Sequence, residues 1–430
     1  MARARGANAL AALAYEPSYG TVPASGFRVQ PFVSCNLGEE QPLEASDVLG
    51  FGRDPQDPTR GAIDSAGDIV VPLCARHIGD WLQLMFGAPT TSAGLFPTGR
   101  ITFSAQPANN ATLTLDGQVI TFVTGTPTAN QVQIGASLAA TVANAVRALN
   151  ASAVTAVAAA TYRGSPTGNA IEITHDTLGT AGNAFTLAVS SSPASNATVS
   201  AATLTGGATS GGYRHVFATG ALSLPSAALE IGLPDVPDYS MHYGVKANSL
   251  AISMARSGNL NATIGLIAQG EAPGTNSTSA GTPAVKEMLK FSHFSGSVLR
   301  QGVPIADLVA GAITISNGLD PVPAIRGDGR VSGVDEGMNS VTGQTSIRYS
   351  SREFQAQAEA GTPIETEYSW YIPGTPWCLR MTVHRVFLPK AKRPITGPGA
   401  IQADYSWQAA ESQSLGRTAT ITLINDVASY

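Results

Sequence analysis

Apolar and polar residues alternate most regularly over residues 246–270. Two alternating runs are separated by Ser257-Gly258-Asn259, a typical turn sequence. Because successive side chains of a strand point to opposite faces, this pattern predicts a β-hairpin with one buried face and one polar face. The predicted buried residues are Leu250, Ile252, Met254, Ile264 and Leu266. The predicted polar residues are Ser249, Ala251, Ser253, Asn261 and Thr263.

Shorter runs of apolar and β-branched residues occur along the rest of the chain and predict further strands. These runs lie at residues 27–35, 69–73, 213–217, 227–231, 291–299, 312–316, 343–349, 368–372, 380–387, 401–408 and 418–424. Residues 78–86 differ, because their apolar positions recur at helical spacing and Gly87 and Pro89 then end the helix. We therefore expect a mainly β fold with one helix packed on a sheet.

Residues 98–209 have the pattern of a complete small domain inside the longer β-rich chain. Within them, Asp116-Gly117 separates two alternating runs and favours the positive φ angles of a tight hairpin turn. Residues 131–150 carry an apolar stripe typical of an amphipathic helix. Since one helix on a small sheet can bury its own core, we expect an inserted α+β domain at 98–209. The flanks, residues 1–97 and 210–430, are then one discontinuous domain.

Residues 36–66 form a long polar stretch punctuated by Gly and Pro. A loop of this length is uncommon inside a compact domain and is usually functional. The charged side chains in it are Glu39, Glu40, Glu44, Asp47, Arg53, Asp54, Asp57 and Arg60. We predict that this segment is an arm that reaches an adjacent subunit or ring.

The amino-acid composition favours a protein that packs on other proteins over one that binds nucleic acid tightly. Of the 430 residues, 43% are hydrophobic and only 13% are charged, and 45 Gly and 27 Pro favour β-structure with many turns and large surfaces that pack on other proteins. The 25 Lys and Arg against 30 Asp and Glu give a net charge of −5, which argues against a surface that grips phosphates.

The three cysteines, Cys35, Cys74 and Cys378, are too few for a disulfide framework and favour assembly in a reducing cytoplasm. The apolar run at residues 8–14 resembles a short signal peptide, but it is rich in Ala and interrupted, so we do not expect secretion. No stretch approaches the roughly 20 apolar residues of a membrane span.

The sequence carries no strong motif for catalysis, metal or cofactor binding. The six histidines lack zinc spacing, the acidic residues near Asp328 do not fit a calcium loop, and phosphate-loop and nucleophile-elbow motifs are absent. Glu365 and Glu367 are two residues apart and would share a face of a strand, as an acid–base pair of a glycoside hydrolase requires. A solvated or lumen-facing strand explains them more simply. We expect no cofactor, no metal and no enzymatic activity.

Four sequence features, taken in order, resemble the tail tube (major tail) proteins of long-tailed bacteriophages. They are Tyr19-Gly20-Thr21, the run Tyr213-Arg214-His215-Val216-Phe217, Leu224-Pro225-Ser226 and the hairpin at 246–270. The resemblance covers most of residues 15–97 and 213–427. It implies a β-sandwich with a flanking helix, and rings in which neighbouring subunits complete an inner β-barrel. Stacked rings would then form the conduit for DNA, with residues 98–209 as an outward-facing accessory domain.

The resemblance also implies partners and a location. The partners are other copies of the chain, tail proteins such as the tape measure and terminator, and DNA that passes without specific binding, with no membrane. The location is the virion tail tube, after assembly in the host cytoplasm. Ala251-Ile252-Ser253 is echoed by Thr314-Ile315-Ser316, so a ring of six tube-type units is either a trimer of duplicated chains or a hexamer. The alternative function is a cell-surface or carbohydrate-binding β-sandwich adhesin, for which Trp370, Trp377 and Trp407 would form the sugar platform.

Overall fold

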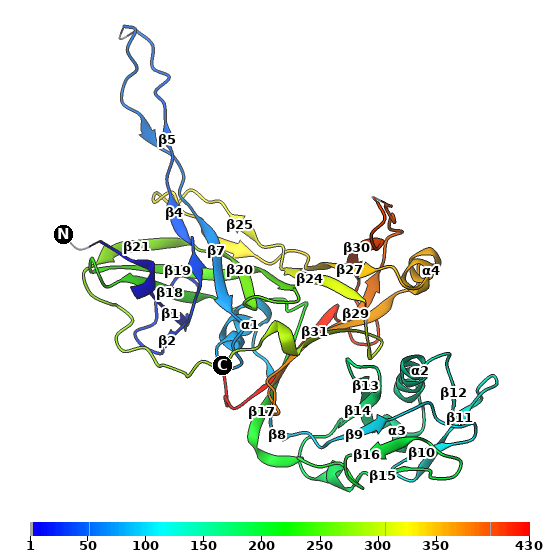
Figure 1. Ribbon diagram of the computed structural model, residues 1–430. Helices are drawn as coiled ribbons and strands as arrows, with labels where there is room; N and C mark the ends of the chain where they lie inside the picture. Colours follow the sequence, from blue (N-terminus) through cyan, green and yellow to red (C-terminus); the bar gives the residue numbers. More distant parts are fainter. Residues whose placement is uncertain (1–2, 51, 306, 396) are drawn as a thin grey trace.

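The computed structural model describes residues 3–50, 52–305, 307–395 and 397–430 and consists mainly of antiparallel strands (Figure 1). The prediction of a mainly β fold with few helices is confirmed. The helices are α1 (Ile78–Phe86), α2 (Leu138–Asn150), α3 (Thr155–Ala158) and α4 (Glu353–Ala360), with short 3-10 turns at Gly6–Asn8, Ala181–Ala184 and His293–Ser295.

Nineteen strands are connected by hydrogen-bonded pairing in the largest sheet. They are β1 (Leu10–Tyr15), β2 (Arg28–Val29), β3 (Ser34–Cys35), β4 (Gly38–Glu40), β7 (Asp64–Pro72), β8 (Thr90–Leu95), β17 (Ala208–Ala218), β18 (Ala227–Leu233), β19 (Asp238–Met254), β20 (Asn261–Ile267), β21 (Gly270–Thr275), β22 (Gly296–Arg300), β23 (Val303–Pro304), β24 (Leu308–Ser316), β27 (Ser340–Arg348), β28 (Ile364–Tyr371), β29 (Cys378–Phe387), β30 (Gln402–Ala409) and β31 (Ala419–Asn425). At its centre six strands pair in the order β7, β20, β19, β24, β27 and β30.

Two short hairpins extend from this sheet. One is β5 (Leu43–Glu44) with β6 (Thr59–Arg60), and the other is β25 (Asp320–Val322) with β26 (Gly333–Asp335). Figure 1 shows the first as a long projection beyond the end of β7 and β4.

The main apolar core lies between the inner faces of these strands and α1. Trp81 of α1 and the strand residues Tyr368 and Trp370 are among its fully buried side chains. Helix α1 packs against β17 and β19. Its Asp80 side chain is also fully buried and accepts hydrogen bonds from Gln30 Nε2 at 3.1 Å and Lys286 Nζ at 3.1 Å, with Arg28 as a further ionic partner. A buried carboxylate needs such partners, and because these partners lie outside α1, the network holds the helix in its position.

Residues 98–209 contain two four-stranded sheets and α2 and α3. One sheet has β12 (Gln131–Gln133), β11 (Gln118–Val123), β10 (Thr112–Leu115) and β15 (Leu187–Val189), and the other has β13 (Ala160–Gly164), β14 (Ala170–His175), β9 (Thr98–Phe103) and β16 (Ala197–Val199). Their apolar side chains form a second core, separate from the main one, against which Val303 of β23 also packs. Asp116 and Gly117 take the positive φ angles, 46° and 80°, that the predicted hairpin turn requires.

Two parts of the large sheet repeat one order of elements. β4, the hairpin β5–β6, β7, α1 and β8 follow one another in the first part, and β24, the hairpin β25–β26, β27, α4 and β28 do so in the second. Both helices end at a glycine with positive φ, Gly87 at 84° and Gly361 at 63°, because a residue without Cβ takes this conformation freely. Each helix is followed by a strand after a short connection.

Several local elements differ from the sequence analysis. The Ala-rich run at residues 8–14 contains most of the strand β1, which was not predicted, and Ala11 to Ala14 are buried in it. The helix predicted at 131–150 begins only at Leu138, because residues 131–133 form β12, which pairs with β11. Helix α4 was not expected, since Glu353–Ala360 carries only one large apolar residue, Phe354.

Candidate assembly surfaces

One face of the six central strands consists mainly of small or polar side chains, few of them charged. Ala251 lies opposite Thr263 on one side and Thr314 on the other, and the register continues from Thr314 to Thr342. These residues therefore share one face of the sheet. Val70, opposite Thr263, and Ser346, opposite Asp404, also lie on this face. The other small and polar residues of its central part, called the polar face below, are Asp68, Ser249, Ala251, Ser253, Asn261, Thr263, Gly265, Ala312, Thr314, Ser316, Ser340, Thr342, Gln344, Asp404, Ser406 and Gln408.

The predicted hairpin has the two faces that its alternation indicated. Its five predicted apolar residues, Leu250, Ile252, Met254, Ile264 and Leu266, are all buried. On the opposite face Ser253 is exposed, while Ser249, Ala251, Asn261 and Thr263 are half-buried beside neighbouring strands. The structure thus brings all five predicted polar residues together and adds β24, β27 and β30 to the same surface.

Charge is sparse on the polar face. Its charged members are Asp68 and Asp404, and none is Lys or Arg. Arg348 is on the same face but is the last residue of β27, and Lys246, in the middle of β19, is paired with Glu336, with Nζ–Oε1 at 2.7 Å. A polyanion that moved along the central part of this face would meet few positive partners.

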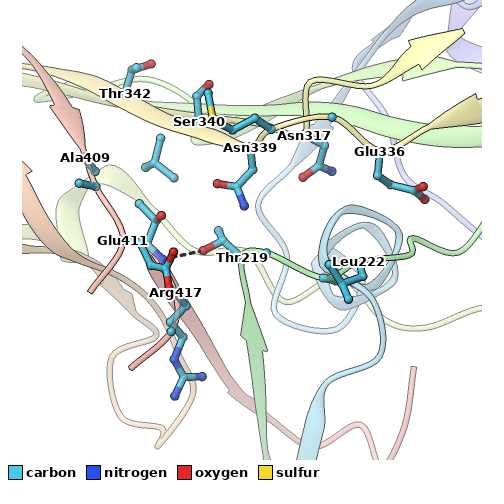
Figure 2. A pocket seen from close by; sticks show the side chains of 18 of the residues that line it. Thr219, Leu222, Asn317, Glu336, Asn339, Ser340, Thr342, Ala409, Glu411 and Arg417 are labelled. Carbon is cyan, nitrogen blue, oxygen red and sulfur yellow. Dashed lines mark hydrogen bonds between the residues drawn. The ribbon is translucent and has the colours of Figure 1, made fainter. Parts of the chain in front are cut away.

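A hollow of about 570 Å³ opens beside the polar face, with Ser340 and Thr342 along one side and Leu222 and Arg417 among the other residues that line it (Figure 2). Some of the polar side chains that line it form hydrogen bonds within the fold. Asn317 Nδ2, for example, donates to the carbonyl oxygens of Met85 and Ala247, each at 2.9 Å. In the part of the chain that the structure describes, His, Cys, Asp and Glu form no group of three that could hold a metal ion.

The predicted arm is a projecting hairpin rather than a long loop. β4 pairs with β7 at its base, Leu43 pairs with Arg60 further out, and the tip lies beyond Glu44 and Thr59 (Figure 1). The charged residues at or beyond this pairing are all exposed; they are Glu44, Asp47, Arg53, Asp54, Asp57 and Arg60. Glu40, closer to the body, is exposed as well.

Glu39 has a different environment from the rest of the predicted arm residues. Both of its carboxylate oxygens accept hydrogen bonds from Arg330 Nη2, at 2.8 and 2.9 Å, and one also accepts from the backbone N–H of Glu271 at 2.7 Å. Glu39 therefore joins the base of the arm to the second hairpin within the same chain. The tip of that hairpin carries Ile325, whose side chain is exposed.

Comparison with known protein families agrees with this architecture. The family model described as phage tail tube protein matches residues 6–213 and, a second time, residues 171–409. The chain belongs to the phage tail tube protein family. No curated protein matches the chain. The predicted family is thus confirmed, and with it a structural role in the virion tail.

In this tail tube family member the two carboxylates considered for hydrolysis lie in different environments. Glu367 is buried and binds Arg163 through two hydrogen bonds, whereas Glu365 is half exposed and lies 3.6 Å from His384 Nδ1. Burial alone would raise the pKa of Glu367, but the charge and hydrogen bonds of Arg163, with Arg380 and Thr382, hold that pKa below its ordinary value. Glu367 is therefore an ion-pair partner in the fold.

The aromatic residues considered as a sugar platform are mostly core residues. Trp370, Tyr368 and Tyr405 are fully buried and Trp407 is nearly so, which leaves Trp377 and Tyr371 partly accessible. Among the residues described, no helix is long and apolar enough to cross a membrane.

Sequence reasoning missed two parts of the candidate surfaces. The acidic residues near Asp328 were considered only as a calcium loop, although they belong to the second hairpin, β25–β26, and the sequence did not indicate that β27 and β30 share the polar face. Both halves of the sequence contain a strand, a polar stretch, a strand, a helix and a glycine in the same order. An alignment of the two halves could therefore have predicted the hairpin β25–β26.

Proposed function

We propose that the chain contains two tandem tube-type units and forms rings of three chains, which stack into the tail tube and conduct DNA into the host. The repeated order of elements from β4 to β8 and from β24 to β28 supports the duplication. The two matches of the family model along one chain support it independently. Three duplicated chains then supply six units to a ring.

Ring closure is proposed to occur between the open edges of the central strands. β30 pairs with β27 along its length but with β29 only through Val386–Ala409 and Phe387–Gln408. At the other side β3 and β4 pair with β7 alone among the described strands. Unpaired strand edges are templates for another chain, and a closed barrel removes them. β30 of one chain and β3–β4 of the next are the edges that would meet.

The polar face is proposed as the wall of the lumen. Its small uncharged side chains, with Ser253 and Thr263 as typical members, form few strong contacts with phosphates. Residues 98–209 would then lie outside the tube as an accessory domain, as their separate core permits. The tape measure and terminator proteins are the proposed neighbours at the ends of the tube, and assembly takes place in the host cytoplasm.

Negative-stain electron microscopy and a mass measurement on the purified protein test this function. We expect rings that contain three chains and that stack into tubes. Rings of six chains would contradict the duplicated-unit trimer. A protein that stays monomeric at high concentration and binds glycans would instead support the adhesin alternative.

A further inference from the structure

The two ends of the central strands carry different surfaces. β7 leaves the arm at Asp64 and ends at Pro72, which pairs with Asn261 at the start of β20. The turn between β19 and β20, the start of β24 and the end of β27 therefore lie at the end of the sheet that is remote from the arm. An arm that extends from one end of these strands points away from the surface at the other end.

A groove of about 680 Å³ occupies this remote end. Apolar side chains of three strands line it, including Met254, Val298 and Leu308, and the exposed Val309 extends the apolar surface. Arg256 and Arg348 also line the groove and are exposed. In the described part of the chain, no carboxylate lies within ion-pair distance of either arginine.

The other charged or titratable groups at the groove do not neutralise the positive charge of both arginines. Asp307 lines it and accepts a hydrogen bond from Ser350 Oγ, and His293 lies at its rim with Nδ1 3.4 Å from the backbone N–H of Ala255. Two arginines against one aspartate leave a net positive surface around an apolar floor. Such a surface suits a segment with acidic flanks and apolar side chains.

The tip of the arm has this composition. Val48 and Leu49 are neighbours and are 55% and 91% exposed, so the tip presents an apolar surface. The charged residues around them are Asp47, Arg53, Asp54 and Asp57, three acids against one base, and all four are exposed. The tip and the groove are thus complementary both in apolar surface and in charge.

We propose that the arm tip of one chain docks into the groove at the opposite sheet end of a second copy in the next ring. This inference rests on the proposed stacking of rings and names the contact that drives it. Because donor and acceptor surfaces lie at opposite ends of the same strands, the contact is head-to-tail. Head-to-tail contacts that do not close generate an open filament, as a tube requires.

Charge reversal of each surface provides the test. The arm variant carries Asp47→Lys, Asp54→Lys and Asp57→Lys, and the groove variant carries Arg256→Glu and Arg348→Glu. Each variant alone has like charges on its tip and groove, so we expect rings that do not stack at low salt. A mixture has opposite charges at both successive contacts, so we expect tubes with the two variants in alternating rings. Electron microscopy and sedimentation measure both results.

The matched control is Arg3→Glu with Arg100→Glu, which changes the net charge as the groove variant does but lies at exposed sites away from the groove. It should form tubes like the unaltered chain. The inference is overturned if either charge-reversed variant alone stacks normally, or if intact rings of both variants fail to stack when mixed. It is also overturned if the control is equally unable to stack.

Hydrogen exchange on the unaltered chain gives a second test that does not depend on variants. Backbone amides of residues 41–62 and 254–256 should exchange at least tenfold more slowly in tubes than in isolated rings. Equal exchange in both states contradicts the docking. Absence of rings in the unaltered protein would instead contradict the proposed function, so the two failures are distinguishable.

Discussion

Arg163 and Glu367 form a buried two-hydrogen-bond ion pair between segments 204 residues apart. Arg163 Nε lies 2.9 Å from Glu367 Oε1, and Nη2 lies 2.8 Å from Oε2. The two side chains are only 14% and 8% exposed. Arg163 belongs to β13 and Glu367 to β28, so the pair attaches residues 98–209 to the second half of the large sheet.

Removal of Glu367 should destabilise the protein more than removal of Arg163. Glu367→Ala leaves the guanidinium groups of Arg163 and Arg380 near each other without the carboxylate, and we expect a loss of about 3–5 kcal/mol in the free energy of unfolding. Arg163→Ala leaves Glu367 beside Arg380, so its effect should be smaller. Urea denaturation measures both. Glu365→Ala, at the exposed neighbour, should stay within about 0.5 kcal/mol; equal losses for the two ion-pair variants would contradict this account.

Residues 98–207 should be removable without loss of ring formation. Leu95 at the end of β8 pairs with Ala208 at the start of β17, so the ends of the segment already lie on adjacent strands. A short Gly-containing turn that joins them would convert β8 and β17 into an ordinary hairpin. The second apolar core would leave as a unit, since its buried residues form a cluster separate from the main core.

We expect the shortened chain to be soluble and to assemble rings of smaller outer diameter in electron micrographs. Insolubility of the shortened chain, while the full chain forms tubes, would show that the segment is part of the core. A variant that retains the segment but carries Arg163→Ala separates loss of the attachment from loss of the domain.

Stability should decrease as the pH falls from about 6.5 to 5. Burial lowers the pKa of His77, His215 and His242 in the folded protein, so the unfolded chain, with ordinary histidine pKa values near 6.5, binds more protons in this interval. Stability from neutral histidines is therefore present above pH 6.5 and is lost below it. Carboxylates with lowered pKa, such as Glu367, lose their contribution only at still lower pH.

Thermal unfolding at pH 7.5 and pH 5 tests this window. His215 is the best site to substitute, because Nδ1 contacts Thr91 Oγ1 at 2.9 Å and Nε2 contacts the carbonyl oxygen of Val427 at 2.8 Å. His215→Gln should be less stable at pH 7.5 but lose less on acidification than the unaltered protein. An identical pH dependence in both would contradict a contribution from His215.

The local pattern predicted those elements that have one face in the core and the other face open. The hairpin of β19 and β20 alternates because one face is in the core and the other is open, and α1 has a continuous apolar stripe. β1 is buried on both faces through small alanines, so no alternation marks it as a strand. The ion pairs of Glu39 with Arg330 and of Arg163 with Glu367 join distant segments, and such contacts leave no periodic signal in one sequence.

The polar face should tolerate positive charge in the fold but not in DNA transport. Ser253 is exposed and lies opposite Ala312, and Thr263 lies opposite Ala251 and Val70, so neither side chain fills the core. Ser253→Lys with Thr263→Lys should therefore fold, form rings and stack like the unaltered chain. In a ring, however, each copy would add two ammonium groups to a wall that has few charges.

Moving DNA would then have to break a phosphate contact at every substituted position. Phage particles that carry the double variant should eject DNA several-fold more slowly at low salt, and added salt should restore the rate by screening. Thr209→Lys with Ser210→Lys, at exposed positions of β17 outside the polar face, is the matched control and should not slow ejection. Normal ejection by the Ser253 and Thr263 variant at low salt, from particles with intact tails, would mean that the polar face does not line the conduit.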